Sequence, residues 1–127
     1  MTRILLIGLA GGLGTLLRYL VGIWAPRLLG TGFPYATFVV NVGGCFLIAL
    51  VYELALRTTL VPPTARIVLT TGFMGGLTTY SSFNYETTGL LRERAWATGL
   101  LNLGLTVVVC FLAGVLGLAL ARRIAGS

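Results

Sequence analysis

The residues best suited to chemistry gather in one short stretch of an otherwise apolar chain. Residues 78–88 read TTYSSFNYETT, and ten of these eleven carry a polar side-chain atom. Buried hydroxyls and amides are costly in hydrocarbon unless they are paired, so this stretch must face protein or water. Backbone carbonyls freed beside it would be able to coordinate a cation. The stretch is therefore a candidate ion site.

Two glycines, Gly75 and Gly76, precede the stretch near the middle of a hydrophobic segment. Glycine is the residue that most easily lets a helix come apart. A broken helix at membrane depth is tolerated only where its freed backbone lines a cavity or is buried in protein. We expect a break within residues 75–79. The alternative is a kink in which Ser and Thr hydroxyls bond back to the preceding turn.

An aromatic pair follows the expected break. Tyr80 and Phe83 are three residues apart and Thr87 comes four later, so all three share one helical face. Aromatic rings have a positive edge, and a pair of rings can attract an anion weakly without any cationic side chain. The alternative for such a pair is ordinary core packing.

Single amides interrupt two other apolar segments. Asn41 is the only amide in its segment, and its NH2 group can donate two hydrogen bonds. Asn102 and Thr106 are one turn apart near the C-terminal end of the chain. Each of these residues is open to two interpretations, an ion path or hydrogen bonding between helices.

Three charged residues lie within the apolar segments. Charges inside a membrane are functional candidates by default, but Arg18 and Glu53 lie near helix ends, where long side chains can reach the interface. Structural pairing is therefore the competing interpretation for Arg18. Glu86 closes the polar stretch, at a position suited to the mouth of a conduit.

The composition is that of a membrane protein. Of 127 residues, 57% are hydrophobic and 9% charged, the mean hydropathy is +0.97, and Lys, Asp and His are absent. Uncharged runs of 25, 19 and 27 residues cover 28–52, 67–85 and 95–121. Each run is long enough for one crossing, since a spanning helix needs roughly 20 apolar residues.

The predicted fold is an all-α integral membrane protein, with residues 1–127 forming a single transmembrane domain. Its four helices are expected at about 4–24, 35–56, 67–91 and 96–121, the third broken at 75–79. Prolines and glycines mark the first two connections. Five arginines fall on one side and three on the other, a weak bias that permits insertion both ways and an antiparallel dimer.

Several function classes are disfavoured. Without His, Asp or a Ser/His pair the chain has no usual acid-base, nucleophilic or side-chain metal set, so an enzyme is not expected. No basic stripe with interleaved aromatics is present, which argues against nucleic-acid binding. Cys45 and Cys110 are 65 residues apart without a CxxC motif, and are interpreted as small buried hydrophobes.

Three segments, LGTLLRY, NVGGCFLI and GGLTTYSSF, resemble those of the small bacterial fluoride channels called Fluc or CrcB. The resemblance covers essentially the whole chain. It implies a dual-topology homodimer of two antiparallel subunits in the lipid bilayer of the bacterial inner membrane. The dimer would carry two pores that pass fluoride passively, exclude chloride and relieve toxicity by exporting cytoplasmic fluoride.

The same resemblance implies site residues. A structural sodium ion (Na+) at the dimer centre would be held by backbone carbonyls of Gly75 and Thr78 from both subunits. The fluoride pore would be lined by Asn41, Thr79, Tyr80, Ser82, Phe83, Asn102 and Thr106, with Arg18 and Glu86 in a vestibule or structural role. The sequence departs from the family pattern at Tyr80, where Phe is usual, and at Cys110, where a hydroxyl is common.

Two other classes fit less well. A small multidrug-type exporter has a similar size, but its proton-coupled chemistry needs an intramembrane carboxylate in the first helix, which this chain lacks. A membrane scaffold without transport would explain the glycines but not the polar stretch.

Overall fold

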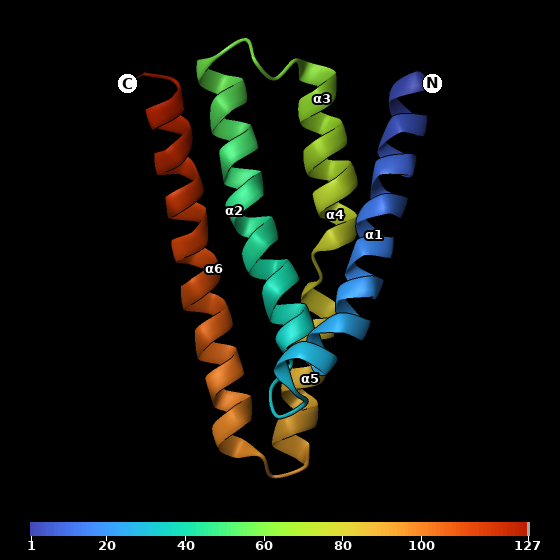
Figure 1. The fold of residues 1–127 in the computed structure, drawn as a ribbon, viewed down its shortest axis with the longest axis vertical. Helices are drawn as coiled ribbons and strands as arrows, with labels where there is room; N and C mark the ends of the chain where they lie inside the picture. The colour runs from blue at the N-terminus through green and yellow to red at the C-terminus, as the bar shows by residue number, and fades with distance from the viewer. Residues whose placement is uncertain (127) are drawn as a thin grey trace.

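The computed structural model describes residues 1–126, and this part of the chain is helical without any strand. The elements in chain order are α1 Thr2–Leu29, α2 Tyr35–Arg57, α3 Pro63–Ile67, η1 Val68–Met74, α4 Gly75–Leu77, α5 Tyr80–Arg92 and α6 Trp96–Ile124. They run four times along the long axis of the molecule (Figure 1). Both termini and the α2–α3 connection lie at one end, and the α5–α6 turn lies at the other. The all-helical prediction is confirmed.

Three helices, α1, α2 and α6, are long and apolar enough to cross a membrane. Many of their large apolar side chains point outward, as with Leu16 of α1 and Phe111 of α6, which is 70% exposed. An outward apolar surface suits lipid, whereas the backbone polar groups are paired inside each helix.

The helix bounds differ from the expected ones where prolines lie. The first helix was expected to end by 24 but continues to Leu29, and Pro26 lies inside its last turns. The proline costs one hydrogen bond, but its own carbonyl still accepts from the N–H of Gly30 at 3.0 Å. The third pass begins at Pro63 rather than 67, because proline suits the first turn of a helix, where the N–H has no partner.

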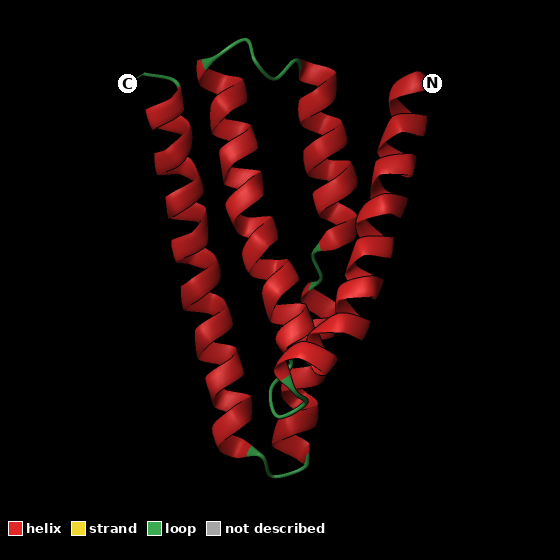
Figure 2. Cartoon of the chain, in the orientation of Figure 1, coloured by secondary structure: helices red, strands yellow, loops and turns green. Residues whose placement is uncertain are grey.

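The third pass consists of several pieces (Figure 2). After α3 the chain forms η1, a π-helical segment, and then the single turn α4. The helix stops after Leu77, because Thr78 and Thr79 are extended, with φ and ψ of −87° and 156° and of −154° and 113°. A new helix, α5, starts at Tyr80.

Gly75 and Gly76, where we expected the helix to open, are themselves helical. Gly76 packs directly on the carbonyl of Gly11 in α1, so a Cβ there would overlap with that oxygen. Its role is therefore close packing. The interruption falls at Thr78 and Thr79, within the expected range of 75–79. Thr79 is the N-cap of α5, and its Oγ1 accepts from the N–H of Ser82 at 3.1 Å.

The bundle consists of two helix pairs. The most extensive contact joins α2 and α6, where Gly117 lies directly against the carbonyl of Phe46. The other pair joins α1 to η1 and α4. Because small residues let helix backbones approach closely, these contacts are of the kind that stabilises helices in lipid. The interrupted pass thus faces α2 on one side and α1 on the other.

A buried carboxylate ties α2 to α6 near the end that carries both termini. Glu53 accepts hydrogen bonds from Arg57, on its own helix, and from Nε of Arg122 on α6 at 3.1 Å. Glu53 was expected to reach the interface; it is held instead within an ion-pair network.

Candidate functional site

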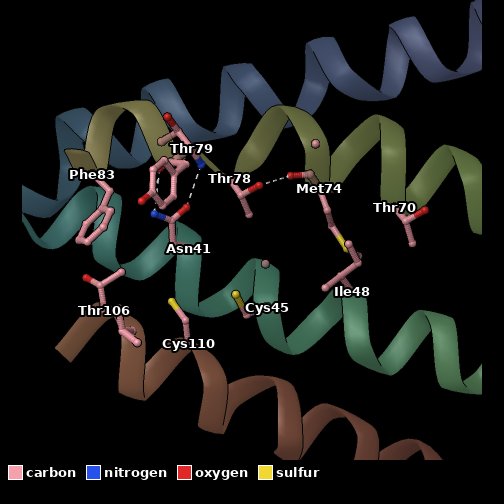
Figure 3. Close-up of a pocket in the computed structure, with 14 residues that line it drawn as sticks. Asn41, Cys45, Ile48, Thr70, Met74, Thr78, Thr79, Phe83, Thr106 and Cys110 are labelled. Atoms are coloured by element: carbon pink, nitrogen blue, oxygen red, sulfur yellow. Dashed lines mark hydrogen bonds between the residues drawn. The ribbon is translucent and has the colours of Figure 1, made fainter. Parts of the chain in front are cut away.

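The side chain of Asn41 binds both backbone groups of Thr79 at the interruption of the third pass. Its Nδ2 donates to the Thr79 carbonyl at 3.0 Å, and its Oδ1 accepts from the Thr79 N–H at 2.8 Å. Figure 3 shows this amide facing Thr79 from α2. Backbone groups without a helical partner must be paired in a membrane, and one buried amide satisfies two of them.

A second contact to the interrupted segment comes from α1. Nε of Arg18 donates to the carbonyl of Gly76 at 3.0 Å, and Oγ1 of Thr15 lies 3.5 Å from the same oxygen. The contact of Arg18 agrees with the structural-pairing interpretation. Thr15 was not predicted, although its spacing of three residues from Arg18 places both on one face of α1.

The interruption changes the environment of the Gly75 carbonyl. In a continuous helix this oxygen would accept from the N–H of Thr79, four residues later. That N–H is directed to Asn41 instead. The N–H and the hydroxyl of Thr78 both donate to the Met74 carbonyl, at 3.0 and 2.8 Å. The Gly75 carbonyl is thereby released from its usual helical partner.

A cavity of about 410 Å³ adjoins this segment between α2, α6 and the third pass. Its lining includes seven of the predicted site residues: Asn41, Gly75, Thr78, Thr79, Tyr80, Phe83 and Thr106. None of the described residues that line it carries a charge. The structure thus brings most of the predicted ion-site residues to one cavity (Figure 3).

The aromatic pair meets edge to face in this cavity. The ring centroids of Tyr80 and Phe83 are 5.8 Å apart with an interplanar angle of 66°. Phe83 is only 6% exposed, whereas Tyr80 is 79% exposed in the single chain. Phe83 therefore presents its ring to the protein interior, and Tyr80 presents most of its surface outward.

Two further polar residues of α5, Ser82 and Glu86, face a second cavity of about 500 Å³. Arg18, Thr79, Ser82 and Glu86 all contribute to its lining. The carboxylate of Glu86 accepts from Oγ1 of Thr37 at 2.6 Å. Oγ1 of Thr79 donates to Oγ of Ser82 at 3.1 Å. Thr79 lines both cavities and so lies between them. Thr37 is a further residue that the sequence did not indicate.

Asn102 lies outside the two cavities that the other predicted residues line. It is 2% exposed, and its Nδ2 donates to Oγ1 of Thr87 at 2.8 Å, which joins α6 to α5. Its Oδ1 accepts from Thr106 at 3.2 Å, so the predicted contact across one turn is present. Asn102 lines neither of the two cavities, whereas Thr106 lines the first.

Side chains in the described residues 1–126 form no group of three or more His, Cys, Asp or Glu suited to a metal. Within that range every buried side-chain nitrogen or oxygen has a hydrogen-bond partner. A cation at this site would therefore depend on backbone oxygens such as the Gly75 carbonyl, whose usual helical partner is directed to Asn41.

Comparison with known proteins agrees with this geometry. A family model described as "CrcB-like protein, Camphor Resistance (CrcB)" matches residues 5–118. The fluoride-specific ion channel FluC of Sorangium cellulosum is 52% identical over 124 residues, covering 98% of both chains. The protein of the same name from Geobacter metallireducens is 48% identical over 98% of this chain and 100% of its own.

A third relative, the fluoride-specific ion channel FluC of an Anaeromyxobacter species, is 45% identical over 99% of this chain and 100% of its own. All three relatives carry the name of an ion channel rather than of an enzyme. With a family match over residues 5–118 and such relatives along nearly its whole length, this multi-pass membrane protein belongs to the CrcB family.

Proposed function

We propose that the protein is a passive, selective fluoride channel that exports cytoplasmic fluoride across the bacterial inner membrane and so relieves its toxicity. The relatives named fluoride-specific ion channels support this kind of transport. The observation that carries the proposal is the cavity that joins the Asn41–Thr79 contact to the edge-to-face pair of Tyr80 and Phe83. This cavity offers polar hydrogens to an anion, and none of the described residues that line it has a positive charge.

A small, tightly hydrated anion needs hydrogen-bond donors in place of its water. The NH2 group of Asn41 has two hydrogens, and only one is used by the Thr79 carbonyl, so the second is free to face an ion. The hydroxyl of Ser82 and the ring edge of Phe83 add further weak sites. The hydroxyls of Thr79 and Thr106 donate to Ser82 and Asn102, so each would have to turn from that partner to bind the ion. Weak, repeated sites suit conduction, because an ion must also leave each of them.

Two such chains inserted in opposite directions would form the active channel. The weak arginine bias permits both orientations. The Tyr80 ring, 79% exposed in one chain, would be covered by the partner, and each cavity would be closed into one of two parallel pores. The interrupted third pass would then be a broken transmembrane helix at the centre of the dimer.

A sodium ion would be held at the dimer centre by the carbonyls of Gly75 and Thr78 from both chains. Two observations support the fit: the Thr79 N–H leaves the Gly75 carbonyl for Asn41, and Gly75 is exposed on the single chain. Neutral oxygens are ligands that hard cations accept. When bound, sodium supplies positive charge beside the anion path and joins the two interrupted segments.

Fluoride efflux from liposomes tests the function directly. Liposomes containing the purified protein should release fluoride to an electrode and retain chloride. Phe83→Ile removes the ring edge and should slow fluoride efflux at least about tenfold, which is about 1.4 kcal/mol in the barrier. Phe111→Ile, at an exposed position on α6, is the matched control and should leave efflux unchanged.

No fluoride release above that of empty liposomes would contradict the channel, and proton-coupled uptake of organic cations would favour an exporter. Equal rates for Phe83→Ile and the wild type would remove this ring from the pore.

The antiparallel arrangement predicts a mixed orientation of the chain termini. Both termini lie at the same end of the helix bundle, so a tag on either terminus reports the orientation of that copy in the membrane. Protease protection in inverted membrane vesicles should show tagged termini on both sides in about equal amounts. Finding every copy with the same orientation would exclude the antiparallel dimer.

The sodium site predicts a sodium-dependent stability. Replacing sodium with a large organic cation should lower the midpoint of thermal unfolding of the purified protein in detergent, because a ligand bound only by the folded state stabilises it. Restoring sodium should restore the midpoint, whereas an equal ionic strength of the organic cation should not. A midpoint independent of sodium would rule out a structural site.

A further inference from the structure

Two cysteines that the proposed function does not use lie in the same cavity. Cys45 on α2 and Cys110 on α6 are both free thiols, both half-buried, and both line the cavity of about 410 Å³. Figure 3 shows Cys45 on α2 and Cys110 on α6 among the side chains that line this cavity. The sequence analysis interpreted them as small buried hydrophobes, but their side chains are accessible from the cavity.

The helix packing brings the two thiols together. Both line the same cavity, one from each of the two packed helices, close enough to interact with each other. One turn beyond Cys110, Gly114 approaches the backbone carbonyl of Cys45, which sets the register of α6 against α2 at this level. The pair therefore depends on the most extensive helix contact in the molecule rather than on a loop.

The surroundings favour soft metals over hard ones. Thiolates bind soft metal ions, whereas hard cations prefer oxygen ligands. Two thiolates exactly neutralise the charge of a divalent ion, and a neutral complex is the form that a cavity with mainly apolar walls accepts most readily. Two sulfur ligands satisfy a soft ion with linear coordination, such as Hg²⁺.

We propose that Cys45 and Cys110 together form a binding site for a soft, thiophilic divalent metal ion. Two S–H bonds break, two sulfur–metal bonds form, and two protons pass to the solvent, so the metal keeps its oxidation state. Because the site lies in the cavity assigned to the anion path, the bound metal obstructs fluoride. This last consequence rests on the proposed function, whereas metal binding itself does not.

Metal retention by the purified full-length protein in detergent tests the site, with Hg²⁺ as the probe and excess glutathione as the competitor. The wild type should retain one mercury per chain after gel filtration. Cys45→Ser and Cys110→Ser should each weaken retention at least about 100-fold, because the second sulfur then no longer acts at high effective concentration. An unchanged elution volume of each variant verifies its fold.

Single variants that retain mercury as well as the wild type would overturn the shared site, as would two mercury ions per wild-type chain or none.

A second measurement compares fluoride efflux from liposomes before and after Hg²⁺ for each protein. The wild type should be inhibited, and Cys45→Ser/Cys110→Ser should keep its own untreated rate. Retention without inhibition would overturn the location of the site on the anion path. Absence of efflux before Hg²⁺ is added would contradict the proposed function alone.

Discussion

The bidentate contact between Asn41 and the backbone of Thr79 is the interaction on which the rest of the site depends. A helix can stop inside a membrane only if its freed N–H and C=O groups find other partners, since each buried group left unpaired costs about 1–3 kcal/mol. Asn41 supplies two of these partners from a neighbouring helix. The N-cap hydroxyl of Thr79 supplies another, and Arg18 binds the Gly76 carbonyl.

The same contacts leave backbone and side-chain groups available to ions at the interruption. Directing the Thr79 N–H to Asn41 releases the Gly75 carbonyl, while the second hydrogen of the Asn41 amide stays available. In the proposed channel, this one side chain would separate an oxygen for the cation from donors for the anion. The cavity beside it has no charged lining that would hold an anion too firmly, and the rings of Tyr80 and Phe83 extend it along α5.

Much of this could be predicted from the sequence, because it depends on local patterns. Gaps between charges located the long helices, and three-residue and four-residue spacings predicted the contacts of Tyr80 with Phe83 and of Asn102 with Thr106. The interruption at Thr78 and Thr79 lies within the predicted range of 75–79, but the partner that supports it could not be predicted in the same way. The interruption depends on Asn41, 38 residues away, whereas Gly76, one of the two glycines that suggested it, packs against α1. The pairing of Glu53 with Arg122, 69 residues apart, was missed for the same reason.

Fluoride efflux from an Asn41→Ala variant is the most direct test of the claim that this amide supports the anion path. The variant places a small apolar side chain in α2 and loses both contacts to Thr79 and the free N–H. At equal amounts of folded, reconstituted protein we expect fluoride efflux to fall at least about 100-fold, or about 2.7 kcal/mol in the barrier. Wild-type efflux from folded Asn41→Ala would contradict the account.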